Sequence, residues 1–142
     1  MLKTFSLQGR LGRLRYFLIS LVVVAMAVIT IFALSRLQVL VGTREGASTL
    51  QGLLALTSVL AVIACICLMV RRLHDFDQSG WWTLSVLVLY LVQGYYEAAD
   101  NRIAAIIMGI LLLVVHLAVI LTPGSKNPNR FGNVPGSTTA PV

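Results

Sequence analysis

Four long apolar runs, separated by polar segments, dominate the chain. They cover residues 16–34, 50–70, 81–96 and 103–121. A helix of about 20 apolar residues crosses the hydrocarbon core of a bilayer, and these runs lack the alternation of barrel strands. The pattern therefore predicts an all-α polytopic membrane protein, a bundle of four transmembrane helices within residues 1–132. The remaining residues, 133–142, are predicted to form a disordered tail.

The third run is the weakest of the four. As a helix, residues 81–96 would rise only about 24 Å, which is less than the thickness of a typical hydrocarbon core. However, Trp81 and Trp82 open this run, and Tyr95 and Tyr96 close it. Aromatic rings at both ends are typical of a helix that reaches both membrane interfaces, and the bilayer can thin slightly around it. We therefore expect a span, with a re-entrant hairpin as the alternative.

The composition supports a membrane protein. Hydrophobic residues make up 58% of the 142 positions and charged residues only 11%. A soluble domain is about one quarter charged, and a chain of this size could not bury so much apolar surface. The first run is too long for the apolar core of a cleaved signal, and further spans follow it, so we expect a retained helix.

The basic residues are distributed unevenly around the predicted spans, and this predicts the orientation. Eight lie before the first run, between the second and third runs, or in the tail, whereas three lie in the other two connections. Basic residues are retained in the cytoplasm, so both termini are predicted to be cytoplasmic. The eight are Lys3, Arg10, Arg13, Arg15, Arg71, Arg72, Lys126 and Arg130, and the three are Arg36, Arg44 and Arg102.

The other two connections are predicted to be passive. Residues 35–49 include small residues and are expected to form a short flexible connection. Residues 97–102 are expected to form a tight turn in which Asp100 or Asn101 caps the fourth helix.

The segment RRLHDFDQSGWW, residues 71–82, concentrates polar chemistry between two apolar runs. Arg71 and Arg72 are expected to close the second helix, where they would meet the negative end of its dipole and the phosphates of the interface. Asp77 or Ser79 is expected to cap the third helix. These roles account for most of the segment as a structural turn between two helices.

Asp75 and His74 are not explained by a turn alone. An unpaired carboxylate at low dielectric costs several kcal/mol, so we expect Asp75 to pair with an arginine or to orient a ring nitrogen of His74. The candidate arginines are Arg10, Arg13, Arg71, Arg72 and Arg130. A metal held by His74, Asp75 and Asp77 is disfavoured, because adjacent ligands on one short segment rarely converge. No metal and no cofactor are expected.

Three segments resemble the family called domain of unknown function 805, which consists of small bacterial inner-membrane proteins. Residues 71–82 resemble its signature, FSLQGRLGRLRYF resembles its opening, and PGSKNPNRFG resembles its closing element. The resemblance implies a multi-pass protein of the bacterial inner membrane and no assigned activity. The matching positions outside the signature are Phe5, Gly9, Arg10, Arg13, Tyr16, Pro123, Gly124, Asn129, Arg130, Phe131 and Gly132.

All three segments fall on the side that the charges assign to the cytoplasm, so we expect them to fold together into one cytoplasmic-face site. The candidate residues of this site are Arg10, Arg13, Arg71, Arg72, His74, Asp75, Ser79, Gly80, Trp81, Trp82, Asn129, Arg130, Phe131 and Gly132.

Three residues inside the apolar runs carry chemistry of their own. His116 lies in the fourth run, and an ionisable residue within a span is by default a candidate functional residue. A neutral imidazole hydrogen-bonded between helices is the favoured interpretation, and a proton relay is the alternative. Cys65 and Cys67 point about 200° apart on a helix, so we expect packing residues and no disulfide.

The sequence contains no phosphate-binding glycine loop, no HExxH motif and no serine elbow. An intramembrane enzyme is therefore the least favoured class, and we expect no catalytic residues. The favoured class is a non-enzymatic membrane protein whose cytoplasmic face binds anionic lipid headgroups or a partner protein. A small oligomeric transporter or channel is the alternative. A homo-oligomer and a membrane-protein partner remain open, and no nucleic-acid partner is expected.

Overall fold

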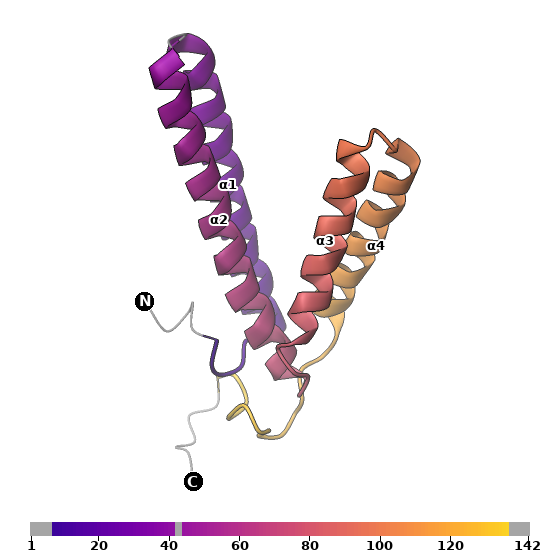
Figure 1. Cartoon of the computed structure of the whole chain (residues 1–142). Coiled ribbons are helices and arrows are strands. Elements are labelled where there is room, and N and C mark those ends of the chain that lie inside the picture. Colours follow the sequence, from indigo (N-terminus) through magenta and orange to yellow (C-terminus); the bar gives the residue numbers. More distant parts are fainter. Residues whose placement is uncertain (1–6, 42–43, 137–142) are drawn as a thin grey trace.

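The computed structural model describes residues 7–41 and 44–136, which form four helices. These are α1 (Arg13–Val41), α2 (Arg44–Asp75), α3 (Trp82–Ala98) and α4 (Arg102–Leu121). Figure 1 shows two helical hairpins, α1 with α2 and α3 with α4, which meet at one end and splay apart toward the other. We call the end where they meet the base, and the opposite ends of the hairpins the tips. The all-α class predicted from the sequence is confirmed for the described residues.

Three helices, α1, α2 and α4, are long and apolar enough to cross a membrane. The remaining helix, α3, has 17 residues and is the shortest of the four. It runs antiparallel to α4 and packs along it, so the two helices lie side by side between the base and the tips (Figure 1). The predicted weakness of the third run is therefore visible as a shorter helix.

One predicted connection is wrong and a second is shorter than expected, because the helices continue past the apolar runs. Arg72 still lies in the last turn of α2, as expected. The expected flexible connection at residues 35–49 is helical up to Val41 and again from Arg44. The start of the RRLHDFDQSGWW segment is also helical, because α2 ends only at Asp75. Helical hydrogen bonding does not require apolar side chains, and no glycine or proline interrupts residues 53–79. The sequence pattern marks only the apolar residues that the hydrocarbon core of a membrane requires, so it does not show that the helices extend further.

One of the two predicted helix caps is confirmed. The side chain of Asn101 accepts a hydrogen bond from the amide of Ala104, at 3.2 Å, and caps α4. At α3 no side chain caps the first turn, and Ser79 Oγ accepts only from the amide of Trp81 at 3.4 Å. Asp77 is held in the left-handed region, with φ of 60°, and its carboxylate meets Arg130 instead.

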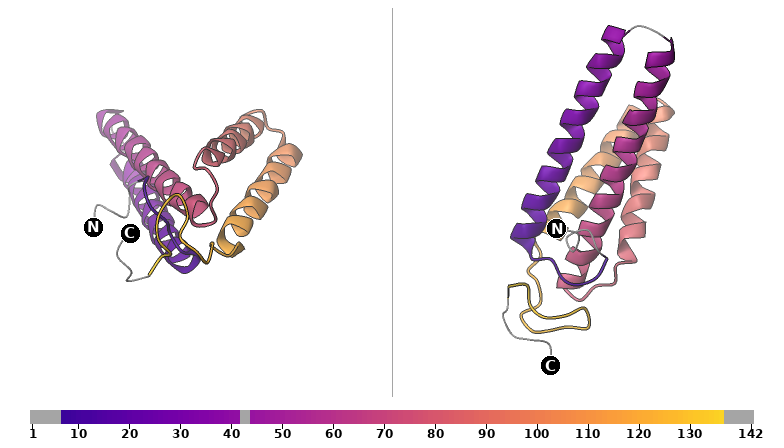
Figure 2. Two further views of the ribbon diagram at one scale, coloured as in Figure 1. Left: turned by 90° about the horizontal axis from the view of Figure 1, so that it is seen from below. Right: turned by 90° about the vertical axis from the view of Figure 1, so that its left-hand side faces the viewer.

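The buried core is small and lies near the base. Most apolar side chains elsewhere are exposed, as is normal for helices whose outer surface faces lipid. The right-hand view in Figure 2 shows the described segments before α1 and after α4 gathered at the base. The core consists of Leu11, Tyr16, Leu68, Met69, Leu73, Val86, Leu112 and Val119.

Residues 1–6, 42–43 and 137–142 lie outside the described part of the chain. Predictions that concern Lys3, Phe5 and the last six residues of the tail therefore fall outside it as well.

Candidate functional site

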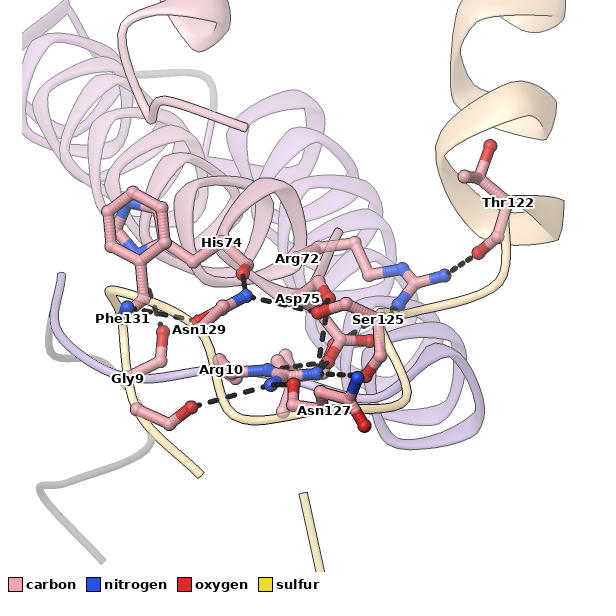
Figure 3. A network of polar contacts seen from close by, with 12 residues as sticks. Gly9, Arg10, Arg72, His74, Asp75, Thr122, Ser125, Asn127, Asn129 and Phe131 are labelled. Carbon is pink, nitrogen blue, oxygen red and sulfur yellow. Dashed lines mark hydrogen bonds and ion pairs between the residues drawn. The ribbon is translucent and has the colours of Figure 1, made fainter. Parts of the chain in front are cut away.

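Asp75, the last residue of α2, lies at the centre of a buried ionic cluster (Figure 3). One carboxylate oxygen, Oδ1, is 3.1 Å from Nη2 of Arg10. The other, Oδ2, accepts from Nη1 of Arg72 at 2.5 Å. The side chains of Arg10, Arg72 and Asp75 are only 1%, 0% and 4% exposed. We call these three residues the clasp, and the predicted pairing of Asp75 with arginine is confirmed.

Arg72 joins α2 to α4 and to the N-terminal segment. Its Nε donates to the carbonyl of Val119 at 3.0 Å, and its Nη2 donates to the carbonyl of Thr122, just beyond α4. Its Nη1 also contacts the carbonyl of Leu11 at 3.4 Å. The carbonyls of Val119 and Thr122 lie in the last turn of α4 and just beyond it, so they have no intrahelical partner to lose. One guanidinium therefore ties the end of one hairpin to the end of the other.

Arg10 joins the N-terminal segment to the segment that follows α4. Its Nη2 donates to the carbonyl of Ser125 at 2.6 Å, and its Nη1 donates to the carbonyl of Asn127 at 2.9 Å. Its Nη1 also contacts the carbonyl of Gly132, at 3.4 Å. The guanidinium presents donors in several directions in one plane, which suits a site with carbonyls on one side and a carboxylate on the other.

The same segments supply donors to the carbonyls at the end of α2. The amide of Leu11 donates to the carbonyl of Arg71 at 3.1 Å, and the amide of Ser125 donates to that of Asp75 at 2.8 Å. The side-chain amide of Asn129 donates to the carbonyl of His74, also at 2.8 Å. The last four carbonyls of a helix lack the usual intrahelical donors. Those of His74 and Asp75 receive donors from the segment after α4, and the segment before α1 donates to Arg71 just ahead of them.

His74 is held beside the clasp by a ring stack. Its imidazole lies parallel to the ring of Phe131, with centroids 3.7 Å apart and an interplanar angle of 5°. Its Nδ1 is 3.3 Å from the carbonyl of Gly9, which can only accept, so Nδ1 carries the proton. The alternative, in which Asp75 orients the ring of His74, is wrong, because both oxygens of that carboxylate face the arginines.

Burial affects the ionisation of His74, which lies beyond the apolar run of residues 50–70. Removal from water lowers the pKa of this imidazole, and the charge of Arg130 acts in the same direction. The contact with the Gly9 carbonyl opposes the shift without reversing it. The net direction of the shift therefore favours the neutral ring.

The other candidate residues surround the clasp without entering it. Arg13 is exposed on the first turn of α1, and Arg71 is half-buried. Arg130 pairs with Asp77 at 3.3 Å in an exposed contact. The side chains of Trp81 and Trp82 are exposed at the start of α3, 77% and 59% as residues.

Gly80 lies where a side chain would crowd α2. A Cβ at this position would lie 2.7 Å from Cγ1 of Val70 and 3.3 Å from Nε2 of His74. The chain turns so close to α2 here that a side chain would force it away. Ser79 precedes it in the same turn and contacts the amide of Trp81.

Sequence reasoning missed several residues of the site that act through the backbone or through the absence of a side chain. Ser125 and Asn127 offer carbonyls to Arg10, and Thr122 offers one to Arg72. Gly124 lies against Asp75, so closely that a Cβ there would overlap the carboxylate. The one available signal was the resemblance of the closing segment, which includes Gly124 but assigns no partner to it.

His116 lies apart from the clasp, on α4. Its Nδ1 is 2.8 Å from the carbonyl of Leu112, and its Nε2 is 3.4 Å from the hydroxyl of Tyr90 on α3. The interpretation of an imidazole hydrogen-bonded between helices agrees with these contacts. Cys65 and Cys67 are both free thiols.

The arginines of the clasp donate to the carboxylate of Asp75 and to backbone carbonyls of the same protein, so the role of the clasp is structural. Within residues 7–41 and 44–136, no group of three or more His, Cys, Asp or Glu side chains lies close enough to hold a metal ion. The buried guanidiniums are occupied by the carboxylate and by carbonyls. Cations available to other molecules must therefore come from the exposed positions around the clasp.

The helices and the clasp together define an all-α protein with apolar, membrane-compatible helices, in which the described segments before α1 and after α4 are tied to the end of α2. The chain belongs to the family described as Protein of unknown function (DUF805), whose model matches residues 4–133. This confirms the resemblance noted in the sequence. No curated protein and no solved structure matches the chain.

Proposed function

We propose that the protein is a four-span integral protein of the bacterial inner membrane, with both termini in the cytoplasm, and that its base binds anionic headgroups. Three helices with the length and composition of spans support the membrane placement. The interfacial rings at both ends of α3 support a fourth span, because Trp and Tyr are enriched at both membrane interfaces. The cluster of basic residues at the base supports the orientation.

The observation that carries the headgroup proposal is the division of the basic residues into two groups. Arg10 and Arg72 are buried and fully engaged in the clasp. Arg13 and Arg15, in contrast, are exposed on the first turn of α1, and that turn contains no acidic residue. Each basic residue near an anionic leaflet contributes about 1 kcal/mol.

Exposed Lys126 and Arg130 extend this basic surface across the segment that follows α4. Arg130 is partly committed to Asp77, which leaves Arg13, Arg15 and Lys126 as the main contributors. The clasp contributes indirectly, because it holds the segment that leads into α1 and the segment that follows α4 together at the base. The proposed activity is non-enzymatic: Arg13, Arg15 and Lys126 form an exposed basic surface that attracts anionic headgroups.

Native mass spectrometry of the purified full chain, released from mixed phosphatidylglycerol and phosphatidylethanolamine, tests the headgroup proposal. We expect preferential retention of phosphatidylglycerol, reduced on the order of tenfold in the double variant Arg13→Gln/Arg15→Gln. Arg102→Gln at the tips is the matched control, because it removes an exposed cation that is paired with Asp100. Equal retention of the two lipids, or no change in the double variant, would reject the proposal.

Cysteine labelling in cells tests the orientation separately. In a background where Cys65 and Cys67 are alanine, Lys126→Cys should react only with reagents on the cytoplasmic side. Ser48→Cys, near the tip of the first hairpin, should react only from the other side. Labelling of Ser48→Cys from the cytoplasmic side alone would contradict the orientation.

A further inference from the structure

A groove of about 310 Å³ with a mainly apolar lining lies between the two hairpins. Its walls come from the halves of α2, α3 and α4 that lie nearest the base, so both hairpins contribute to it. Four of its apolar residues are buried and two are half-buried, which gives the groove a well-packed apolar floor. These six residues are Met69, Leu73, Val86, Leu89, Val115 and Val119.

Three polar side chains complete the lining, and all three are exposed. Gln78 belongs to the turn between α2 and α3, where its backbone amide donates to the carbonyl of Leu73 at 2.9 Å. Trp82 and Ser85 lie on the first turn of α3. Within residues 7–41 and 44–136, these three side chains form no hydrogen bond to another protein group. The edge of the groove therefore offers an amide, an indole and a hydroxyl donor beside an apolar floor.

The polar and apolar groups follow a definite order along α3. Trp82 lies at the base, Ser85 lies about 4.5 Å further along the helix axis, and Leu89 lies about 6 Å beyond Ser85. A phospholipid in a membrane has the same order of chemistry, with its phosphate outermost, then its ester carbonyls and then its acyl chains. Trp is typical of the interface at which the phosphates lie. The groove therefore matches a phospholipid whose acyl chain points toward the tips.

We propose that the groove holds one membrane phospholipid by a single acyl chain, with its phosphate at Gln78 and Trp82 and an ester carbonyl at Ser85. The phosphate oxygens accept from the Gln78 amide and the Trp82 indole, and hydrogen bonds to an ionised acceptor are the stronger kind. The acyl chain covers the apolar floor between the hairpins. A helix of a second copy, about 10–12 Å across with its side chains, is too wide for a groove of this volume.

The charges at the edge of the groove predict which part of the lipid is recognised. No charged side chain of the described residues lines the groove. Asp77, next to Gln78, is paired with Arg130 at 3.3 Å, so this neighbouring pair adds no net charge. We therefore expect recognition of the phosphate, which phosphatidylethanolamine and phosphatidylglycerol share. Their affinities for the groove should differ by less than about fivefold, because exposed charge pairs contribute little.

This lipid site rests on the membrane placement proposed above, but it uses none of the cations of the basic surface. Arg13, Arg15 and Lys126 are absent from the lining of the groove. The groove and the basic surface therefore predict opposite selectivities. The groove should hold either phospholipid, whereas the basic surface should prefer phosphatidylglycerol.

Native mass spectrometry of the delipidated full chain in detergent, titrated with one lipid at a time, measures this binding. The probes are dioleoylphosphatidylethanolamine, dioleoylphosphatidylglycerol and dioleoylglycerol, which has the same chains and ester groups but no phosphate. We expect one saturable site for each phospholipid and binding of dioleoylglycerol that is about tenfold weaker. The double variant Arg13→Gln/Arg15→Gln should retain this site with similar affinities for the two phospholipids.

A matched pair of variants locates the site on α4. Val115→Phe fills the groove and should weaken both phospholipids about tenfold. Val114→Phe adds the same ring at the neighbouring residue, which is exposed outside the groove, and should change neither. Ser85→Phe fills the groove from its exposed edge and should act like Val115→Phe, so the result does not depend on how the buried floor repacks.

A further variant tests the partner of the phosphate. Gln78→Ala removes one donor and leaves the apolar floor intact. We expect it to reduce the advantage of the phospholipids over dioleoylglycerol from about tenfold to about threefold, with the binding of dioleoylglycerol unchanged.

Three results would overturn the proposal. These are equal binding of dioleoylglycerol and the phospholipids, equal effects of Val115→Phe and Val114→Phe, and a preference for phosphatidylglycerol above about fivefold in the double arginine variant. If the unmodified chain retains the two phospholipids equally while Val115→Phe still weakens both, headgroup attraction by the basic surface is rejected and the groove site is supported. The two proposals can therefore fail separately.

Discussion

Replacement of Asp75 by asparagine is the sharpest perturbation of the clasp. The carboxylate accepts a charge-assisted hydrogen bond from Arg10 and another from Arg72, and its side chain is 4% exposed. Such bonds contribute about 1.5–3 kcal/mol each. Asparagine retains one acceptor oxygen but turns an amide donor toward one of the two guanidiniums. We therefore expect a loss of about 3 kcal/mol, within the range for breaking a buried ion pair.

Urea unfolding of the full chain in detergent micelles measures this loss. Asp100→Asn is the matched control, because it removes the same charge from a pair whose two side chains are 87% exposed. An exposed pair contributes less than about 1 kcal/mol. If the two variants lose equal stability, or if Asp75→Asn stays within about 1 kcal/mol of the unmodified chain, the buried clasp does not hold the base together.

Three further predictions concern the surroundings of the clasp. Gly124→Ala should cost about 1–3 kcal/mol in the same unfolding assay, because its Cβ would overlap the carboxylate of Asp75, whereas Gly52→Ala, whose Cβ would meet nothing within 4 Å, should cost nothing. Phe131→Leu should cost about 0.5–1.5 kcal/mol through the lost stack on His74, and a variant as stable as the parent would show that the stack contributes little. Because burial lowers the pKa of His74, the unfolded chain takes up the proton first, so stability should fall as the pH drops below about 6.5, and His74→Gln should remove that part of the slope.

The helices and the ionic pairing could be predicted from the sequence because both depend on properties of single residues. Runs of apolar residues predict helices in lipid, and one acid among several arginines predicts a pair. The choice of Arg10 and Arg72 over Arg13 could not be predicted, since it depends on which guanidinium reaches both Asp75 and the free carbonyls at the ends of α2 and α4.

The backbone partners of the clasp lie beyond sequence reasoning for a related reason. Every residue carries a carbonyl, so nothing in the sequence marks those of Ser125 and Asn127 as the acceptors of Arg10. The continuation of α2 to Asp75 was also missed, because a helix that leaves the hydrocarbon core no longer needs apolar residues. The groove lined by residues of α2, α3 and α4 arises from the way the two hairpins meet, which no local pattern encodes.

Amide hydrogen exchange tests most directly whether one buried cluster holds the segments before α1 and after α4 against α2. The amide of Leu11 donates to Arg71 and the amide of Ser125 donates to Asp75, from opposite ends of the sequence. Both amides should exchange slowly in the unmodified chain, and both should accelerate in Asp75→Asn, while the capped amide of Ala104 stays unchanged. Acceleration of only one of the two, or rapid exchange of both in the unmodified chain, would contradict the clasp.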